Sequence, residues 1–255
     1  MTRAAPLGLA VGLAATLVIV AGGAGAQEIT LSLGGEAASG APGSLAERTI
    51  QIIALVTLLS LVPGLAIMIT CFPFLVTVLS ILRMAIGLQQ SPPNMLIVSL
   101  ALFLTYFVME PVFVQAWGEG LLPLTEGRLT AAEALPLALQ PFRVFMADRM
   151  DPATFTELAA LRALPGEALP LPAPEAPLSI LVPSFLLSEI QRAFEIGFLI
   201  FLPFLIIDLV VAAILMSMGM MMVPPAVVSL PFKLAFFVVA DGWTMLAGAL
   251  VRSYM

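Results

Sequence analysis

The chain alternates long apolar stretches with short polar turns, a pattern typical of proteins built from membrane-crossing helices. Stretches of about 20 apolar residues can span a bilayer, and shorter ones suit half-helices or helices that pack on protein. Internal prolines predict kinks. The pattern therefore predicts an all-α membrane protein of kinked helical hairpins. The apolar helices are expected over residues 49–70, 72–82, 95–117, 183–218 and 226–251.

The first residues have the pattern of a secretory signal. Arg3 precedes an apolar stretch over residues 7–20, and Ala24 and Ala26 fit a small-residue cleavage site. We predict a cleaved signal peptide over residues 1–26; the alternative is an uncleaved first membrane helix. Cleavage would leave residues 27–48, rich in Gly, Ala and Ser, as a flexible extracytoplasmic leader.

A polar insert separates two apolar regions. Residues 118–178 hold eight acidic residues and four arginines and end in a proline-rich run. We expect this insert to be extracytoplasmic and to contain short amphipathic helices over residues 139–148 and 152–164. It follows a first apolar helical region over residues 49–117 and precedes a second apolar hairpin over residues 179–255.

Composition excludes several functional classes. Hydrophobic residues make up 61% of the chain and charged residues 10%, against about 45–50% and 25% in soluble proteins. A net charge of −6 leaves no basic surface for nucleic acid. The chain has no histidine and one cysteine, Cys71, which excludes His-based triads, His/Cys metal sites and an intrachain disulfide. We expect no catalytic residue, no metal and no cofactor, and therefore no enzyme.

Charged residues inside apolar helices are candidate sites, because a charge in hydrocarbon is costly unless it is paired or wet. Glu189 and Arg192 lie three residues apart and can pair on one helix face, although such a face can also simply neutralise itself near an interface. Lys233 is the only lysine of the chain. We expect it to form an ion pair, between helices or between subunits, with Glu189 or Asp208.

A methionine-rich turn interrupts the last apolar region. Residues 209–232 carry no charge, yet Gly219, Pro224 and Pro225 break the helix there, and five of the residues 216–222 are methionine. The soft, unbranched thioether makes a surface that deforms around guests of different shape. The alternative is that these methionines fill gaps between packed helices.

Several motifs together resemble the FliP family of the flagellar type III secretion export gate. The resemblance covers nearly all of residues 49–251. The motifs are LVPGLAIMITCF at 61–72, QQSPPN at 89–94, FLLSEI at 185–190, AFEIG at 193–197, MMMVPP at 220–225, LPFK at 230–233 and DGW at 241–243.

The resemblance implies a subunit that assembles with further copies of itself into a pentameric ring. FliQ-like and FliR-like proteins would join this ring. The ring would lie in the bacterial inner membrane within the flagellar basal body and pass unfolded flagellar proteins. Met220, Met221 and Met222 match the methionine loop that closes the gate, while Glu189 and Lys233 match positions at contacts between ring members.

Other functions remain open at this point. The virulence-type injectisome subunits share most of these motifs, and the predicted signal peptide favours the flagellar branch. A small-solute or proton-coupled permease would use the intramembrane carboxylates as a relay and usually shows internal repeats, of which none is convincing here. A membrane scaffold without transport would tolerate alanine at Met220, Met221 and Met222.

Overall fold

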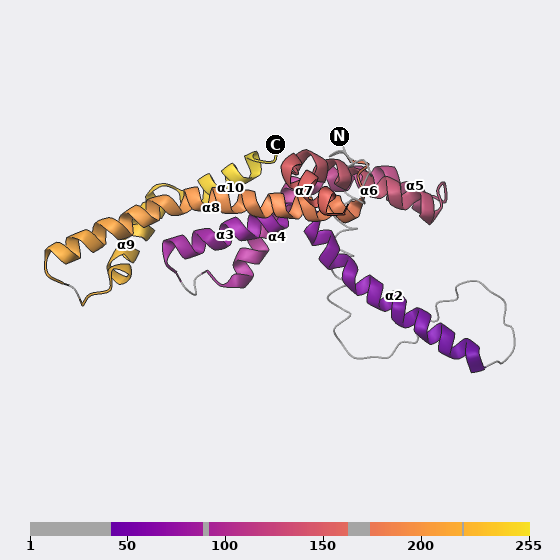
Figure 1. Ribbon diagram of the computed structural model, residues 1–255, viewed down its shortest axis with the longest axis horizontal. Helices are drawn as coiled ribbons and strands as arrows, with labels where there is room; N and C mark the ends of the chain where they lie inside the picture. The colour runs from indigo at the N-terminus through magenta and orange to yellow at the C-terminus, as the bar shows by residue number, and fades with distance from the viewer. Residues whose placement is uncertain (1–41, 89–91, 163–173, 221) are drawn as a thin grey trace, which may run out of the picture. The chain divides into compact units, whose positions relative to one another are not determined.

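The structure is a computed structural model that describes residues 42–88, 92–162, 174–220 and 222–255 (Figure 1). These residues form helices without a strand, which confirms the all-α prediction. The predicted signal peptide and most of the predicted leader lie outside the described residues. The elements are α2 (Pro42–Met68), α3 (Phe72–Ile86), α4 (Asn94–Ala116), the π-helix η1 (Trp117–Leu121), α5 (Leu122–Thr125), α6 (Ala131–Arg149), α7 (Pro152–Arg162), α8 (Leu178–Ser217), α9 (Pro225–Val239) and α10 (Gly242–Arg252).

The chain divides into two units, residues 1–52 and residues 53–255. Helix α2 crosses this boundary, and all later elements belong to the second unit. The first described residue of α2 is Pro42, so this helix begins seven residues earlier than the apolar pattern predicts.

Within the described residues, three helical stretches are long and apolar enough to cross a membrane: Thr49–Met68, Asn94–Thr125 and Leu178–Ser217. The second stretch is continuous through α4, η1 and α5 and is longer than the apolar pattern predicts. Its π-helical turn places Gly120 against α6, where a Cβ atom would lie 2.5 Å from that of Ala138. Glycine is therefore required for this close approach.

The short helix α3 forms the centre of the main core. The buried residues of α3 cover a wide face of the helix, and this face packs against α4, α8 and α9. Helix α8 approaches α3 closely at Gly197, where a Cβ atom would lie 2.4 Å from Cδ1 of Ile81. The buried residues of α3 are Phe74, Leu75, Val78, Leu79, Leu82, Ala85 and Ile86.

The polar insert folds as helices against the first half of α8. Helix α6 begins eight residues before its predicted start because Thr130 and Glu133 form a capping box, in which the Thr130 N–H donates to Oε2 of Glu133 at 3.0 Å. Helices α6 and α7 share a second buried cluster with α8 that includes Met146, Phe155 and Phe185. The insert is therefore part of the packed fold.

The return helix predicted over residues 226–251 is broken in the structure. Helix α9 returns along α8 (Figure 1) and ends at Val239, and α10 then bends away from it by 62°. The break lies at Asp241, whose φ of 47° is in the left-handed region that aspartate tolerates better than most residues. The following Gly242 packs against the ring of Phe237, where a Cβ atom would clash.

Candidate functional site

The methionine-rich turn is a capped helix end joined to a proline-initiated helix. Gly219 follows the end of helix α8 with φ 76°, and its N–H donates to the Met216 carbonyl at 3.1 Å. The Met220 N–H donates to the Leu215 carbonyl at 3.0 Å. These two bonds form a Schellman motif, which satisfies the last carbonyls of α8. Helix α9 then starts at Pro225.

The side chains of this turn are apolar and exposed. Met218 is 67% exposed and Met222 is 97% exposed, and Met220 is also exposed. The third predicted gate residue, Met221, lies outside the described residues. Burying exposed thioethers against another apolar surface is favourable, so the turn is suited to contact with a further chain.

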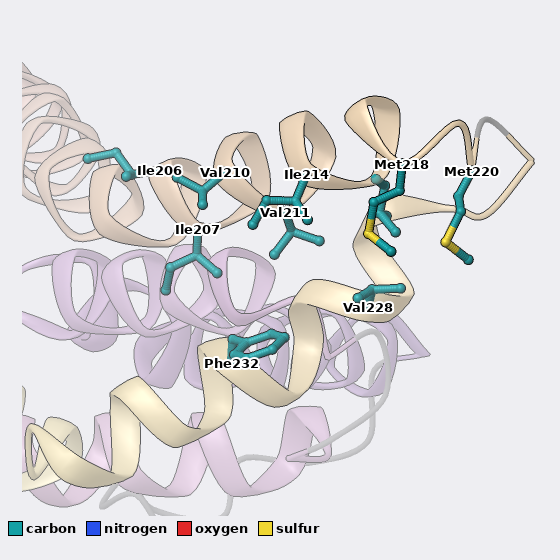
Figure 2. Close-up of a pocket in the computed structure, with 10 residues that line it drawn as sticks. Ile206, Ile207, Val210, Val211, Ile214, Met218, Met220, Val228 and Phe232 are labelled. Carbon is teal, nitrogen blue, oxygen red and sulfur yellow. The ribbon is translucent and has the colours of Figure 1, made fainter.

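A groove of about 520 Å³ continues from the turn between α8 and α9. Figure 2 shows Met218 and Met220 at the end of this groove beside the turn, with aliphatic side chains of α8 facing Val228 and Phe232 of α9. None of the described residues that line it is charged. The lining residues are Ile206, Ile207, Val210, Val211, Ile214, Leu215, Met218, Met220, Val228 and Phe232.

An ion pair joins the two helices of the hairpin, next in sequence to the groove-lining residues Ile207 and Phe232. The Lys233 ammonium on α9 donates to Oδ2 of Asp208 on α8 at 2.7 Å. It also donates to the Ala85 carbonyl near the end of α3 at 3.0 Å. The Ser229 hydroxyl donates to the second carboxylate oxygen of Asp208 at 2.6 Å. One buried lysine thus holds three helices together.

A second charged cluster surrounds Glu189, which is fully buried on α8. Its Oε1 accepts from Nε of Arg149 at 3.2 Å and from Nη1 of Arg192, one turn along α8, at 3.5 Å. Its Oε2 accepts from the hydroxyl of Tyr254. A buried carboxylate needs such charged donors to offset the loss of hydration.

Arg149 and Tyr254 were missed by the sequence analysis. Arg149 ends helix α6 of the insert, and its Nη1 donates to the Ser253 carbonyl at 2.7 Å. Tyr254 follows α10 and is inserted between Phe74 and Phe145. Burial, and next the charge of Glu189, raise the pKa of the Tyr254 hydroxyl. The available sequence signal was weak: a basic residue at a helix end and an aromatic residue near a chain end.

The structure therefore distributes the predicted charges over two sites. Glu189 and Arg192 lie together in one cluster, while Asp208 and Lys233 lie in the other. Within the single chain Lys233 contacts Asp208 and does not contact Glu189. Among the described residues, no group of three His, Cys, Asp or Glu side chains could hold a metal ion.

Long apolar helices with charges paired between them define an all-α membrane protein. A model of the FliP family matches residues 55–250. The flagellar biosynthetic protein FliP of Caulobacter vibrioides is 50% identical over 215 residues, which cover 84% of this chain and 80% of that protein. Proteins of the same name are 46% identical over 215 residues in Agrobacterium fabrum, covering 83% of this chain and 86% of the relative, and 43% identical over 209 residues in Bacillus subtilis, covering 81% and 92%.

The chain belongs to the FliP family. This confirms the resemblance inferred from the sequence motifs. The family assignment also supports the expectation that the chain is not an enzyme.

Proposed function

We propose that this chain is a core subunit of the flagellar type III secretion export gate. In this proposal it forms part of a pore for unfolded flagellar proteins, and the turn containing Met220, Met221 and Met222 closes that pore. The proposal is supported by relatives that are named flagellar biosynthetic proteins and by the apolar helices of the chain.

The exposed methionine-rich turn is the observation that carries the proposal. The turn lies between the Schellman motif at Gly219 and the start of α9 at Pro225, and methionine side chains are uncharged and flexible. A gate for polypeptides of any sequence needs a deformable, uncharged constriction, since specific contacts would trap the guest. A short turn between two helices that carries soft side chains meets this requirement.

The assembly follows from the same proposal. We propose a ring of further copies, with FliQ-like and FliR-like proteins, in the bacterial inner membrane at the flagellar basal body. Glu189, Arg192, Asp208 and Lys233 would position the hairpin and contribute to contacts between subunits. A cleaved signal peptide over residues 1–26 and an extracytoplasmic insert over residues 118–178 belong to this proposal.

A permease that relays protons through intramembrane carboxylates is less well supported. Glu189 accepts from two arginines and a tyrosine, and Asp208 accepts from Lys233 and Ser229. The oxygens of both carboxylates are already bonded to donors of the same chain, as in structural ion pairs. Their arrangement is that of a structural support.

The test replaces Met220, Met221 and Met222 together by alanine in the whole assembly in its native membrane. We expect the membrane to leak ions and small solutes while the subunit still assembles. The matched control replaces three other exposed methionines, Met84, Met95 and Met245, and should not leak. A tight membrane with unchanged flagellar export in the first variant would contradict the gate.

A further inference from the structure

Glu110 lies at the middle of the apolar helical stretch Asn94–Thr125. At a rise of about 1.5 Å per residue, it lies roughly 24 Å from one end and 22 Å from the other. Its side chain is exposed, and it forms no hydrogen bond or ion pair with any residue that the structure describes. A carboxylate is hardest to accommodate in hydrocarbon at this depth.

Exposed aromatic side chains surround Glu110 on one side of α4. The spacing of 100° per residue places them within about 60° of Glu110 around the helix. The buried residues Ala101, Thr105 and Met109 lie about 100° to 180° away from Glu110 around the helix. We call the exposed side the aromatic face of α4; its members are Phe103, Tyr106, Phe107, Glu110, Phe113 and Val114.

This composition fits a protein partner better than lipid. Aromatic residues are enriched at the centres of protein interfaces. Amphipathic aromatic side chains in membranes concentrate at the two interfaces, whereas Tyr106 lies one turn from the midpoint of the helix. A partner that covers this face must supply a positive charge opposite Glu110.

The described basic residues of this chain do not supply that charge. Lys233 is bonded to Asp208, and Arg149 and Arg192 are bonded to Glu189. Arg83 and Arg252 lie in the last turns of α3 and α10, and the other described arginines belong to the polar insert, apart from Arg48 in α2. The stretch Thr49–Met68 contains no lysine or arginine.

We propose that the aromatic face of α4 is a docking surface for an apolar helix of a different protein, which places a lysine or arginine against Glu110. The inference does not depend on the proposed gate. A partner helix of this kind buries both the aromatic side chains and the charge pair away from lipid.

The test places a photo-crosslinking amino acid at position 107 of the whole chain in its native membrane. We expect one discrete adduct, whose cross-linked peptide is an apolar segment of another protein with a basic residue near its middle. Glu110→Gln should lower the yield, and Glu110→Lys should abolish it. When Glu110→Lys is combined with a change of the partner's basic residue to glutamate, the charges are swapped. The cross-linking yield should then recover to at least about one-tenth of the yield of the natural pair.

Two controls keep the outcome clear. Glu119→Gln removes an exposed carboxylate near the end of the same helical stretch and should leave the yield unchanged. The cross-linker at position 161, on the exposed surface of α7, should not give the adduct. Adducts to lipid or to a second copy of this chain, or a yield indifferent to Glu110→Gln, would each overturn the proposal.

Discussion

The guanidinium of Arg149 lies over the ring of Tyr254, 4.0 Å from the ring centroid. Arg149 belongs to the insert and Tyr254 to the last turn of the chain, so this contact closes a loop of more than 100 residues. Both side chains also bind the buried carboxylate of Glu189. The end of the chain, the insert and α8 therefore meet at the charged cluster around Glu189.

The hydroxyl of Tyr254 should contribute measurably to stability. Tyr254→Phe keeps the ring between Phe74 and Phe145 but removes a hydrogen bond to a charged acceptor, so we expect a loss of about 2 kcal/mol. Thermal unfolding in detergent measures this loss. Tyr106→Phe, which removes an exposed hydroxyl, is the control and should change the stability by less than about 0.5 kcal/mol. Equal effects of the two variants would contradict the cluster.

Removing the charge of Asp208 should destabilise the protein more than removing the charge of Lys233. Asp208→Asn leaves a buried ammonium with the Ala85 carbonyl and a neutral amide, and we expect a loss of about 3 kcal/mol. Lys233→Met leaves a carboxylate that is 32% exposed and still accepts from Ser229, so about 1–2 kcal/mol is expected after allowance for solvent screening.

Thermal unfolding of both variants checks this order. Asp241→Asn is the matched control, because Asp241 is an exposed carboxylate on the same stretch of chain, and it should cost less than about 0.5 kcal/mol. The prediction is wrong if Lys233→Met is the more destabilising of the two changes.

The thiol of Cys71 should make stability fall at alkaline pH. Burial raises its pKa from 9.0 to about 12. The folded state holds the thiol proton more tightly than the unfolded state does. The contribution of Cys71 to the free energy of unfolding is therefore constant below pH 9 and falls as the pH rises toward 12. The stability advantage of the natural chain over Cys71→Ala should shrink by up to about 1.4 kcal/mol per pH unit in that window. A constant difference from pH 8 to pH 11, measured by thermal unfolding, would exclude this effect.

The left-handed glycine at the end of α8 should be required for the shape of the methionine-rich turn. Gly219→Ala places a Cβ atom at φ 76°, and we expect it to destabilise the protein by about 1 kcal/mol. Gly64→Ala is the control: Gly64 lies inside α2, and a Cβ atom added there would meet no other atom within 4 Å, so alanine should be neutral or slightly stabilising. Thermal unfolding compares the two, and a similar loss in both would argue against a special role for Gly219.

Much of the architecture could be predicted from the sequence, because it depends on neighbouring residues. The length of an apolar stretch determines whether it can span a bilayer, and Gly219 with Pro224 and Pro225 predicts the turn between α8 and α9. The boundaries were less well predicted. The capping box at Thr130 extended α6, and the left-handed Asp241 divided the return helix in two.

The sequence by itself determined that the chain is an all-α membrane protein of the FliP family with an uncharged methionine-rich turn. Only the tertiary structure decided which charges meet: Glu189 binds Arg149 and Tyr254, 40 and 65 residues away, and Lys233 binds Asp208 and α3. It also left Glu110 exposed. Helix formation is set locally, whereas charge pairing depends on how each helix is rotated and shifted against its neighbours, which the packing of the whole core determines.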